Sequence, residues 1–125
     1  MAAPNIVNVA TITAKTALVR LADTSENTLV SNSASSGKVF KINNIIVSNV
    51  DGTDDATITV VVWDTATVGS TNGTKIAHTI NVPADSTLVL IDKSSAIYLE
   101  EDRSIGVAAS AADDLHVICS YEEIS

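Results

Sequence analysis

The sequence predicts an all-β protein: a single antiparallel β-sandwich of jelly-roll or Ig-like type, with about nine strands and no substantial helix. Its second half repeats short alternating apolar runs, each closed by a turn signal such as Pro83-Ala84-Asp85-Ser86. Runs at this spacing are typical of sandwiches and barrels. Ala, Val, Ile, Thr and Ser fill most of the 125 residues, and the β-branched types among them favour strands.

In the second half we expect strands at residues 76–82, 87–91, 97–99, 105–109 and 115–121. In the first half we expect them at 5–22, 28–31, 38–50 and 56–63, with the longest loop at 64–75. Apolar residues fall on both parities of 38–50, which indicates a bulge near Asn43-Asn44. Asp51-Gly52 signals a hairpin that would make 56–63 the partner of 38–50.

The segment 14–22 is open to two interpretations. Its apolar residues can form two helical turns, with Ala14, Ala17, Leu18 and Leu21 on one side. A strand is favoured because Thr11, Thr13, Thr16 and Val19 disfavour helix and no N-cap residue precedes the run.

Length and charge limit the possible organisation and partners. We expect one domain over residues 1–125, with 1–9 as a candidate extended N-terminal arm. The formal net charge is −8 and the seven basic residues are scattered, which argues against nucleic acid or an anionic membrane as a partner. The start lacks the pattern of a signal peptide, and no apolar run approaches the roughly 18–20 residues of a membrane span. We therefore expect synthesis and folding in a cytoplasm.

No motif in the chain carries obvious chemistry. Cys119 is the single cysteine, and its strand parity predicts a buried small hydrophobe. His78 and His116 lack the spacing of a metal site or of a nucleophile–base pair. The Asp51–Asp55 turn lacks the residue order of a calcium loop. We expect no catalytic residue, no metal, no cofactor and no enzymatic activity.

Trp63 is the only tryptophan, placed where a strand enters the longest loop. Two roles are open for it. It can pack in the core, or it can anchor an interface, because a lone large aromatic beside a loop is typical of binding hot spots.

The amino-acid sequence resembles the sequences of small virion structural proteins of tailed phages, in particular those of marine cyanobacterial phages. The resemblance spans nearly the whole chain. It rests on MAAPNIV (1–7), SSGKVFKIN (35–43), SNVDGT (48–53), VPADSTLV (82–89), IYLEE (97–101) and SYEEIS (120–125).

This resemblance implies a non-enzymatic, multicopy component of a virion. We expect a capsid decoration (cement) protein that contacts the major capsid protein and associates with itself, a trimer being one arrangement. Ile6, Val7 and Trp63 are the candidate contacts. The alternative is a receptor- or glycan-binding module of a tail fibre or neck appendage, although such a module would normally expose several aromatics.

Overall fold

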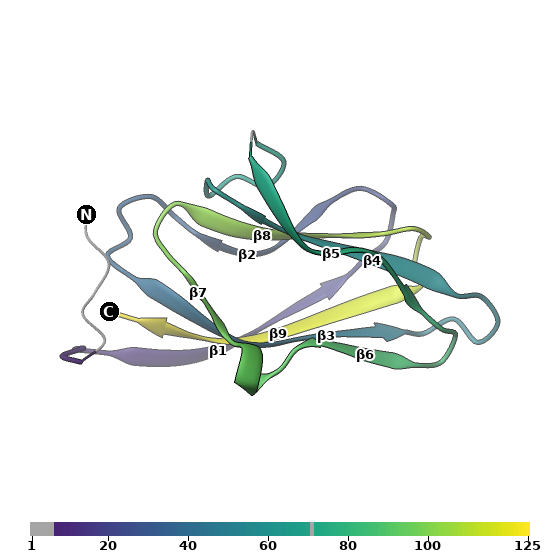
Figure 1. The fold of residues 1–125 in the computed structure, drawn as a ribbon, viewed down its shortest axis with the longest axis horizontal. Coiled ribbons are helices and arrows are strands. Elements are labelled where there is room, and N and C mark those ends of the chain that lie inside the picture. Colours follow the sequence, from purple (N-terminus) through teal and green to yellow (C-terminus); the bar gives the residue numbers. More distant parts are fainter. Residues whose placement is uncertain (1–6, 71) are drawn as a thin grey trace.

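The computed structural model describes residues 7–70 and 72–125, which form two antiparallel sheets packed face to face (Figure 1). Sheet A has the strand order β1-β9-β3-β6, with β7 also pairing with β3, and sheet B has the order β2-β8-β4-β5. The elements are β1 (Ile12–Arg20), β2 (Asn27–Asn32), β3 (Val39–Asn49), β4 (Ala56–Trp63), β5 (Gly73–Val82), β6 (Thr87–Ile91), the 3₁₀ turn η1 (Lys93–Ser95), β7 (Ile97–Leu99), β8 (Arg103–Ala109) and β9 (Leu115–Ile124).

This strand order is that of a jelly roll. The first long strand, β1, pairs with the last, β9, while β2 pairs with β8, and β4 pairs with β5. The chain therefore folds as a long ribbon whose two halves interleave in both sheets, which is the double Greek key of jelly-roll domains. The all-β sandwich prediction is confirmed, and the topology selects the jelly roll over the Ig-like arrangement.

Most of the expected strands are confirmed. The open segment 14–22 lies mainly in strand β1, paired with β9 along its whole length. The bulge expected near Asn43-Asn44 is present, because the register of β3 against β9 shifts between Ile42 and Asn44. This shift lets Ile42 and Ile45 both face the core, where both are fully buried.

The hairpin predicted at Asp51-Gly52 is wrong. β3 lies in sheet A and β4 in sheet B, so the turn carries the chain from one sheet to the other. The Asp51 carboxylate accepts hydrogen bonds from the backbone N–H of Thr53 and of Asp54, at 2.8 and 3.1 Å. A side chain that bonds its own backbone in this way stabilises a turn locally and does not specify which strands pair.

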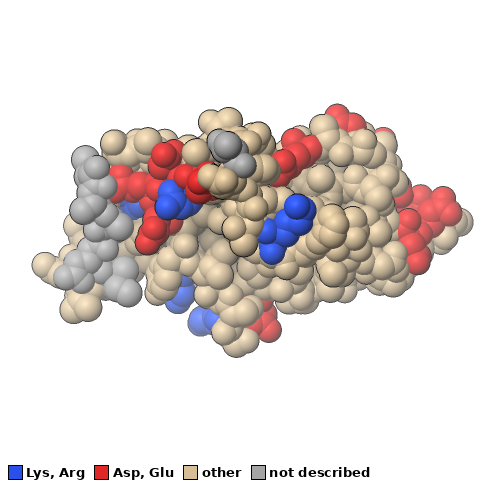
Figure 2. Space-filling view, turned by 45° about the horizontal axis from the view of Figure 1, so that its top comes forward, with Lys and Arg blue, Asp and Glu red and all other residues tan. Residues whose placement is uncertain are grey.

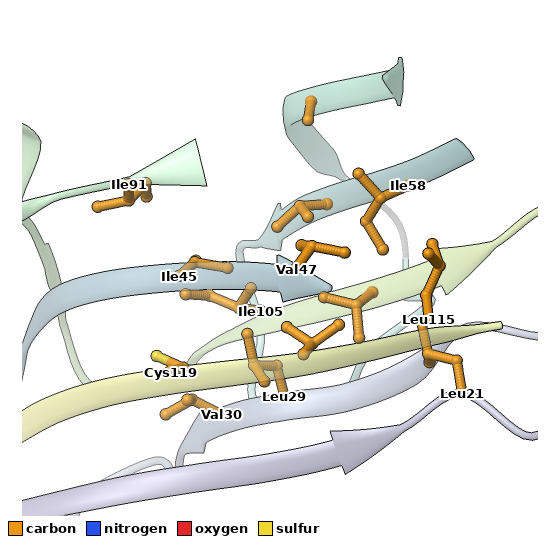
Figure 3. Close-up of a cluster of buried hydrophobic side chains, with 14 of the residues drawn as sticks. Leu21, Leu29, Val30, Ile45, Val47, Ile58, Ile91, Ile105, Leu115 and Cys119 are labelled. Atoms are coloured by element: carbon orange, nitrogen blue, oxygen red, sulfur yellow. The ribbon is translucent and has the colours of Figure 1, made fainter. Parts of the chain in front are cut away.

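The core lies between the two sheets (Figure 3). Strand alternation predicts it, because every second side chain of a strand points to the same face. Its largest fully buried members come from six of the nine described strands and, in the case of Leu21, from the segment after β1. The largest are Leu21, Ile42, Ile45, Ile58, Leu99, Ile105, Leu115, Val47, Val60, Val82, Val107 and Val117.

Strand β5 contains a bulge with unusual backbone geometry. The register against β4 jumps from the Ile58–Ile80 pair to the Val60–Ala77 pair, and Thr79 within the jump has φ of 49°. A β-branched residue in the left-handed region is a genuine outlier, because its Cβ crowds the following carbonyl. The backbone N–H of Thr79 donates to Thr59 Oγ1 at 3.1 Å, which holds the bulge in place.

Replacing Thr79 by Asn should stabilise the protein. Asn tolerates the left-handed conformation better, and the Thr59 bond uses only the backbone of residue 79, so we expect a gain of about 1 kcal/mol. Urea unfolding followed by Trp63 fluorescence measures the change. Thr74→Asn, in the same strand and exposed but with negative φ, is the control and should gain nothing. If Thr79→Asn is no more stable than Thr74→Asn, the left-handed backbone of Thr79 does not cost stability.

Candidate functional site

A row of apolar side chains crosses the outer face of sheet A, one from each of its four main strands. In register, Leu18 of β1 is opposite Ile118 of β9, Ile118 is opposite Ile46 of β3, and Ile46 is opposite Val89 of β6. Leu18 is 74% exposed, Val89 55% and Ile118 39%, while Ile46 is half-buried between its neighbours. We call these four residues the apolar row.

Polar residues flank the apolar row on both sides. On one side Thr16 Oγ1 is 3.2 Å from Ser120 Oγ, and the Ser120 backbone N–H donates to Asn44 Oδ1 at 3.0 Å. The row on the other side is formed by Arg20, His116, Ser48 and Thr87. The outer face of sheet A therefore has an apolar centre and a polar rim, which is the composition of a contact surface.

A hollow opens beside the apolar row where β1 and β9 run together. It has a volume of about 180 Å³ and is lined by Leu18, Val19, Arg20, His116, Val117 and Ile118. Because Leu18 protrudes directly next to it, this part of the face offers both a projecting side chain and a recess.

Trp63 forms a second cluster, on the outer face of sheet B. The ring is half-buried, and its Nε1–H donates to Glu26 Oε2 at 2.8 Å. A Cβ on Gly73 would lie 2.6 Å from Val61 Cγ1 and 2.9 Å from Trp63 Cζ3, so the indole packs directly against a bare backbone. Val61 is 7% exposed and is buried in this cluster, outside the main core. Val60 belongs to the main core and Val62 packs against it, so all three consecutive valines are at least partly buried.

The loop between β4 and β5 is fastened to its surroundings. Ser31 Oγ donates to the carbonyl of Ala66 at 2.7 Å, and Ser104 Oγ to the carbonyl of Thr65 at 2.8 Å. The backbone N–H of Ala66 donates to Asp102 Oδ1 at 2.8 Å. These bonds reach the loop from strands β2 and β8 and from the turn before β8, so the described loop residues present a defined surface.

A shallow pocket lies where this loop meets the Trp63 cluster. Its volume is about 380 Å³, and it is lined by Val62, Trp63, Asp64, Asn72, Thr74 and Arg103. Asn72 Nδ2 donates to Asp64 Oδ2 at 3.0 Å, and Arg103 Nη1 donates to the carbonyl of Asp64 at 3.1 Å. An aromatic ring is thus combined with acid, amide and guanidinium groups at one site.

Of the three candidate contacts predicted from the sequence, the structure describes two, Val7 and Trp63. Ile6 lies outside the described residues, and Val7 is 90% exposed near the start of the described chain. Trp63 lies on sheet B, among its own neighbours. The apolar row has no local signal in the sequence, although the parity of its strand assigns Ile118 outward.

The residues considered for chemistry lie apart. His78 is exposed on β5 in sheet B, and His116 is half-buried on β9 in sheet A. Cys119 is buried as expected, and burial raises the pKa of its thiol to about 12. Within residues 7–70 and 72–125 no group of three or more His, Cys, Asp or Glu is placed to hold a metal ion.

Acidic side chains gather at both ends of the molecule, whereas lysines and arginines are separated (Figure 2). At one end the turns after β3 and β8 meet, and the Val50 backbone N–H donates to the carbonyl of Asp114 at 2.8 Å. Desolvation and the nearby carboxylate of Asp51 raise the pKa of Asp114. The pKa of Asp51 is instead lowered by the backbone N–H groups of Thr53 and Asp54.

No protein-family model matches the chain, and no curated protein sequence matches it. In the described residues, no helix is long and apolar enough to cross a membrane.

Solved structures do share the fold. The chain is similar to one from Bacillus endospore appendages that form disulfide-linked pili, at 16% identity and TM-score 0.51 over 92% of this chain and 88% of that one. It is similar to a chain of the acid-stable capsid of Helicobacter pylori bacteriophage KHP30, at 8% identity and TM-score 0.52 over 94% and 90%. It also aligns with a chain of infectious bursal disease virus, at 11% identity and TM-score 0.52, covering 91% of this chain but 32% of that one. At these identities the likeness establishes the fold.

Gly73→Ala should disrupt the Trp63 cluster. The new methyl group would overlap Val61 and the indole ring, and overpacking of this kind costs about 1–3 kcal/mol. We expect a lower urea midpoint together with a shift in Trp63 emission. Gly52→Ala is the matched control, because its Cβ would meet nothing nearer than 3.7 Å and its φ is not positive. Equal effects of the two substitutions would refute the packing role of Gly73.

Asp114→Asn should stabilise the protein at pH 7. The folded-state pKa of Asp114 is raised above its ordinary value, so its ionised form opposes folding at neutral pH. The benefit of the substitution should disappear as the pH falls below about 4, where the wild-type carboxyl is protonated in both states.

Asp92→Asn should have the opposite effect. Hydrogen bonds from Ser94 lower the pKa of Asp92, so its ionised form supports folding at pH 7 and that support is lost in acid. Urea midpoints at pH 7 and pH 3 measure both variants. A urea midpoint of Asp114→Asn below that of the wild type at pH 7 would contradict the raised pKa of Asp114.

Proposed function

We propose that this protein is a non-enzymatic structural component of a phage virion, and specifically a capsid decoration (cement) protein bound to the shell in many copies. The observation that carries the proposal is the jelly roll itself, which spans the described chain and aligns over 90% of a chain from a phage capsid structure. The resemblance of the sequence to small virion proteins of tailed phages supports the same role.

The proposed partners are the major capsid protein and further copies of this chain. Val7, with Ile6 before it, and Trp63 remain the proposed contacts with the shell. Val7 is 90% exposed, and the Trp63 cluster is held beside a fastened loop. Contacts of a few hundred Å² contribute several kcal/mol at about 25 cal/mol per Å², before association costs. Repetition over a symmetric shell then supplies avidity.

The charge distribution suits dense coating of a surface. The net charge of −8 keeps the free protein soluble. Much of that charge lies at the two ends of the sandwich, as Figure 2 shows, which leaves parts of the sheet faces available for apolar contacts.

A second candidate function is glycan or receptor binding on a tail fibre or neck appendage. The pocket lined by Trp63, Asp64, Asn72 and Arg103 favours it, because an aromatic surface with amide, acid and guanidinium groups can hydrogen-bond a sugar. Its single aromatic ring makes it a weaker candidate than the decoration role.

Rebinding to stripped capsids tests the decoration role. Purified protein added back to shells that lack it should bind and should raise their resistance to heat or low salt. Trp63→Ala, or deletion of residues 2–9, should weaken rebinding while circular dichroism still reports a β protein. Ile80→Ala is the control, because Ile80 is 41% exposed on sheet B and lies near the end of β5 opposite to Gly73, the residue paired with Trp63.

Two outcomes would overturn the decoration role. The protein could co-purify with tails and be absent from heads, or stripped heads could fail to take it up at any concentration. Binding to a glycan array that is lost in Asn72→Ala would then support the appendage function.

A further inference from the structure

We infer that the apolar row is a self-association surface, on which a second copy of this chain docks face to face about a two-fold axis. This names the surface for the self-association in the proposed function, but its test needs no particle. The row runs across all four main strands of sheet A, and each residue lies opposite its neighbour in the strand register. A continuous apolar row with polar rows on either side is unusual for a sheet face that stays in water, where outward positions are mostly polar.

The shape of the surface fits a copy of itself. A two-fold interface uses the same patch on both partners, so the patch must be complementary to itself. Leu18 projects from the sheet at 74% exposure, and the hollow of about 180 Å³ lies next to it toward Arg20 and His116. A two-fold axis in the plane of the interface, parallel to the row and displaced toward the hollow, brings each Leu18 to the hollow of the other copy.

The charge of the surface also permits pairing with itself. The outward positions of β1, β3, β6 and β9 carry Arg20, Lys41 and Glu122, so acidic residues do not predominate there although the whole chain has a net charge of −8. Two copies meeting through this face avoid the repulsion expected when acidic surfaces approach each other. The turns after β3 and β8, which hold Asp51 and Asp114, meet at one end of the sandwich, beyond the row (Figure 1).

The size of the face is adequate for a dimer. Strands β1, β9 and β3 are 9, 10 and 11 residues long, and the edge strand β6 has 5 residues. At about 4.8 Å between strands and about 3.3 Å per residue, the face spans roughly 19 Å across the strands and roughly 30 Å along the three long ones. That is the order of the about 800 Å² per partner in a standard stable interface. Two sheets packed in this way would lie about 10 Å apart with aligned strands, as in an ordinary sandwich.

The opposite face of the molecule is less suited to the same packing. On the outer side of sheet B, Glu26 and Val68 lie over Gly106, where an added Cβ would be 2.2 Å from the Glu26 carboxylate oxygen and 2.8 Å from Val68 Cγ1. The fastened loop between β4 and β5 rises beside them. A flat partner sheet cannot approach that surface closely.

Sedimentation of the purified full chain over a concentration series tests the inference. We expect the wild-type mass to rise with concentration from the 13.0 kDa monomer to twice that value. Ile118→Lys, at 39% exposure, places a charge in the centre of the row on both copies and should raise the dimer dissociation constant at least about tenfold. Ile80→Lys is the matched control, because it makes the same change at 41% exposure on sheet B and should leave the dimer intact.

Each other result overturns the inference. A monomer at every concentration, a trimer, or equal dissociation by Ile118→Lys and Ile80→Lys would each exclude the two-fold pair. A monomer that still rebinds stripped shells, and loses rebinding with Ile118→Lys, would assign the row to the shell protein instead. That outcome would leave the decoration role standing. Leu18→Lys, at an edge strand where folding is least at risk, provides a second variant if Ile118→Lys fails to fold.

Discussion

The structure depends on the position of the last strand, β9, between β1 and β3. β9 is hydrogen-bonded on both sides, with the register running from Ile124 to His116 against β1 and to Leu115 against β3. Alternate residues of this strand, including Val117 and Cys119, are fully buried in the core. Because two strands from the first half of the chain, β1 and β3, pair with β9 near its end, neither half can complete sheet A alone. The fold is dominated by long-range contacts of this kind, which makes it a cooperative unit.

The same strand organises both faces of sheet A. Its inward residues fill the space against sheet B, and its outward Ile118 joins Leu18 to Ile46 in the apolar row. Toward the C-terminus, Glu123 lies 3.2 Å from Lys15 and 3.1 Å from Lys38, which ties the neighbouring strand β1 and the entry to β3 to the strand end. Core, surface row and strand end are thus set by one register, so a slip of one residue would exchange the two faces.

The two surfaces of the molecule differ in how they are built. On sheet A the residues of interest are strand residues, positioned by the ladder itself. On sheet B the Trp63 cluster depends on side-chain bonds, such as Glu26 to the indole and Ser31 to the loop, and on the missing Cβ of Gly73. A surface of the first kind is flat and regular and suits another sheet. The second kind is irregular and suits a loop, a terminus or a small ligand.

The sequence by itself determined the strands, the bulge in β3 and the inward or outward side of residues such as Cys119 and Ile118, because alternation and turn chemistry act over a few neighbouring positions. It did not determine which strands pair. Asp51-Gly52 made a turn but not a hairpin, since an Asx turn is satisfied by its own backbone whichever sheet the chain enters next. Only the tertiary structure aligned Leu18, Ile46 and Val89 in one row with Ile118, because their alignment arises from pairings between residues up to 100 positions apart, and no local pattern records that register.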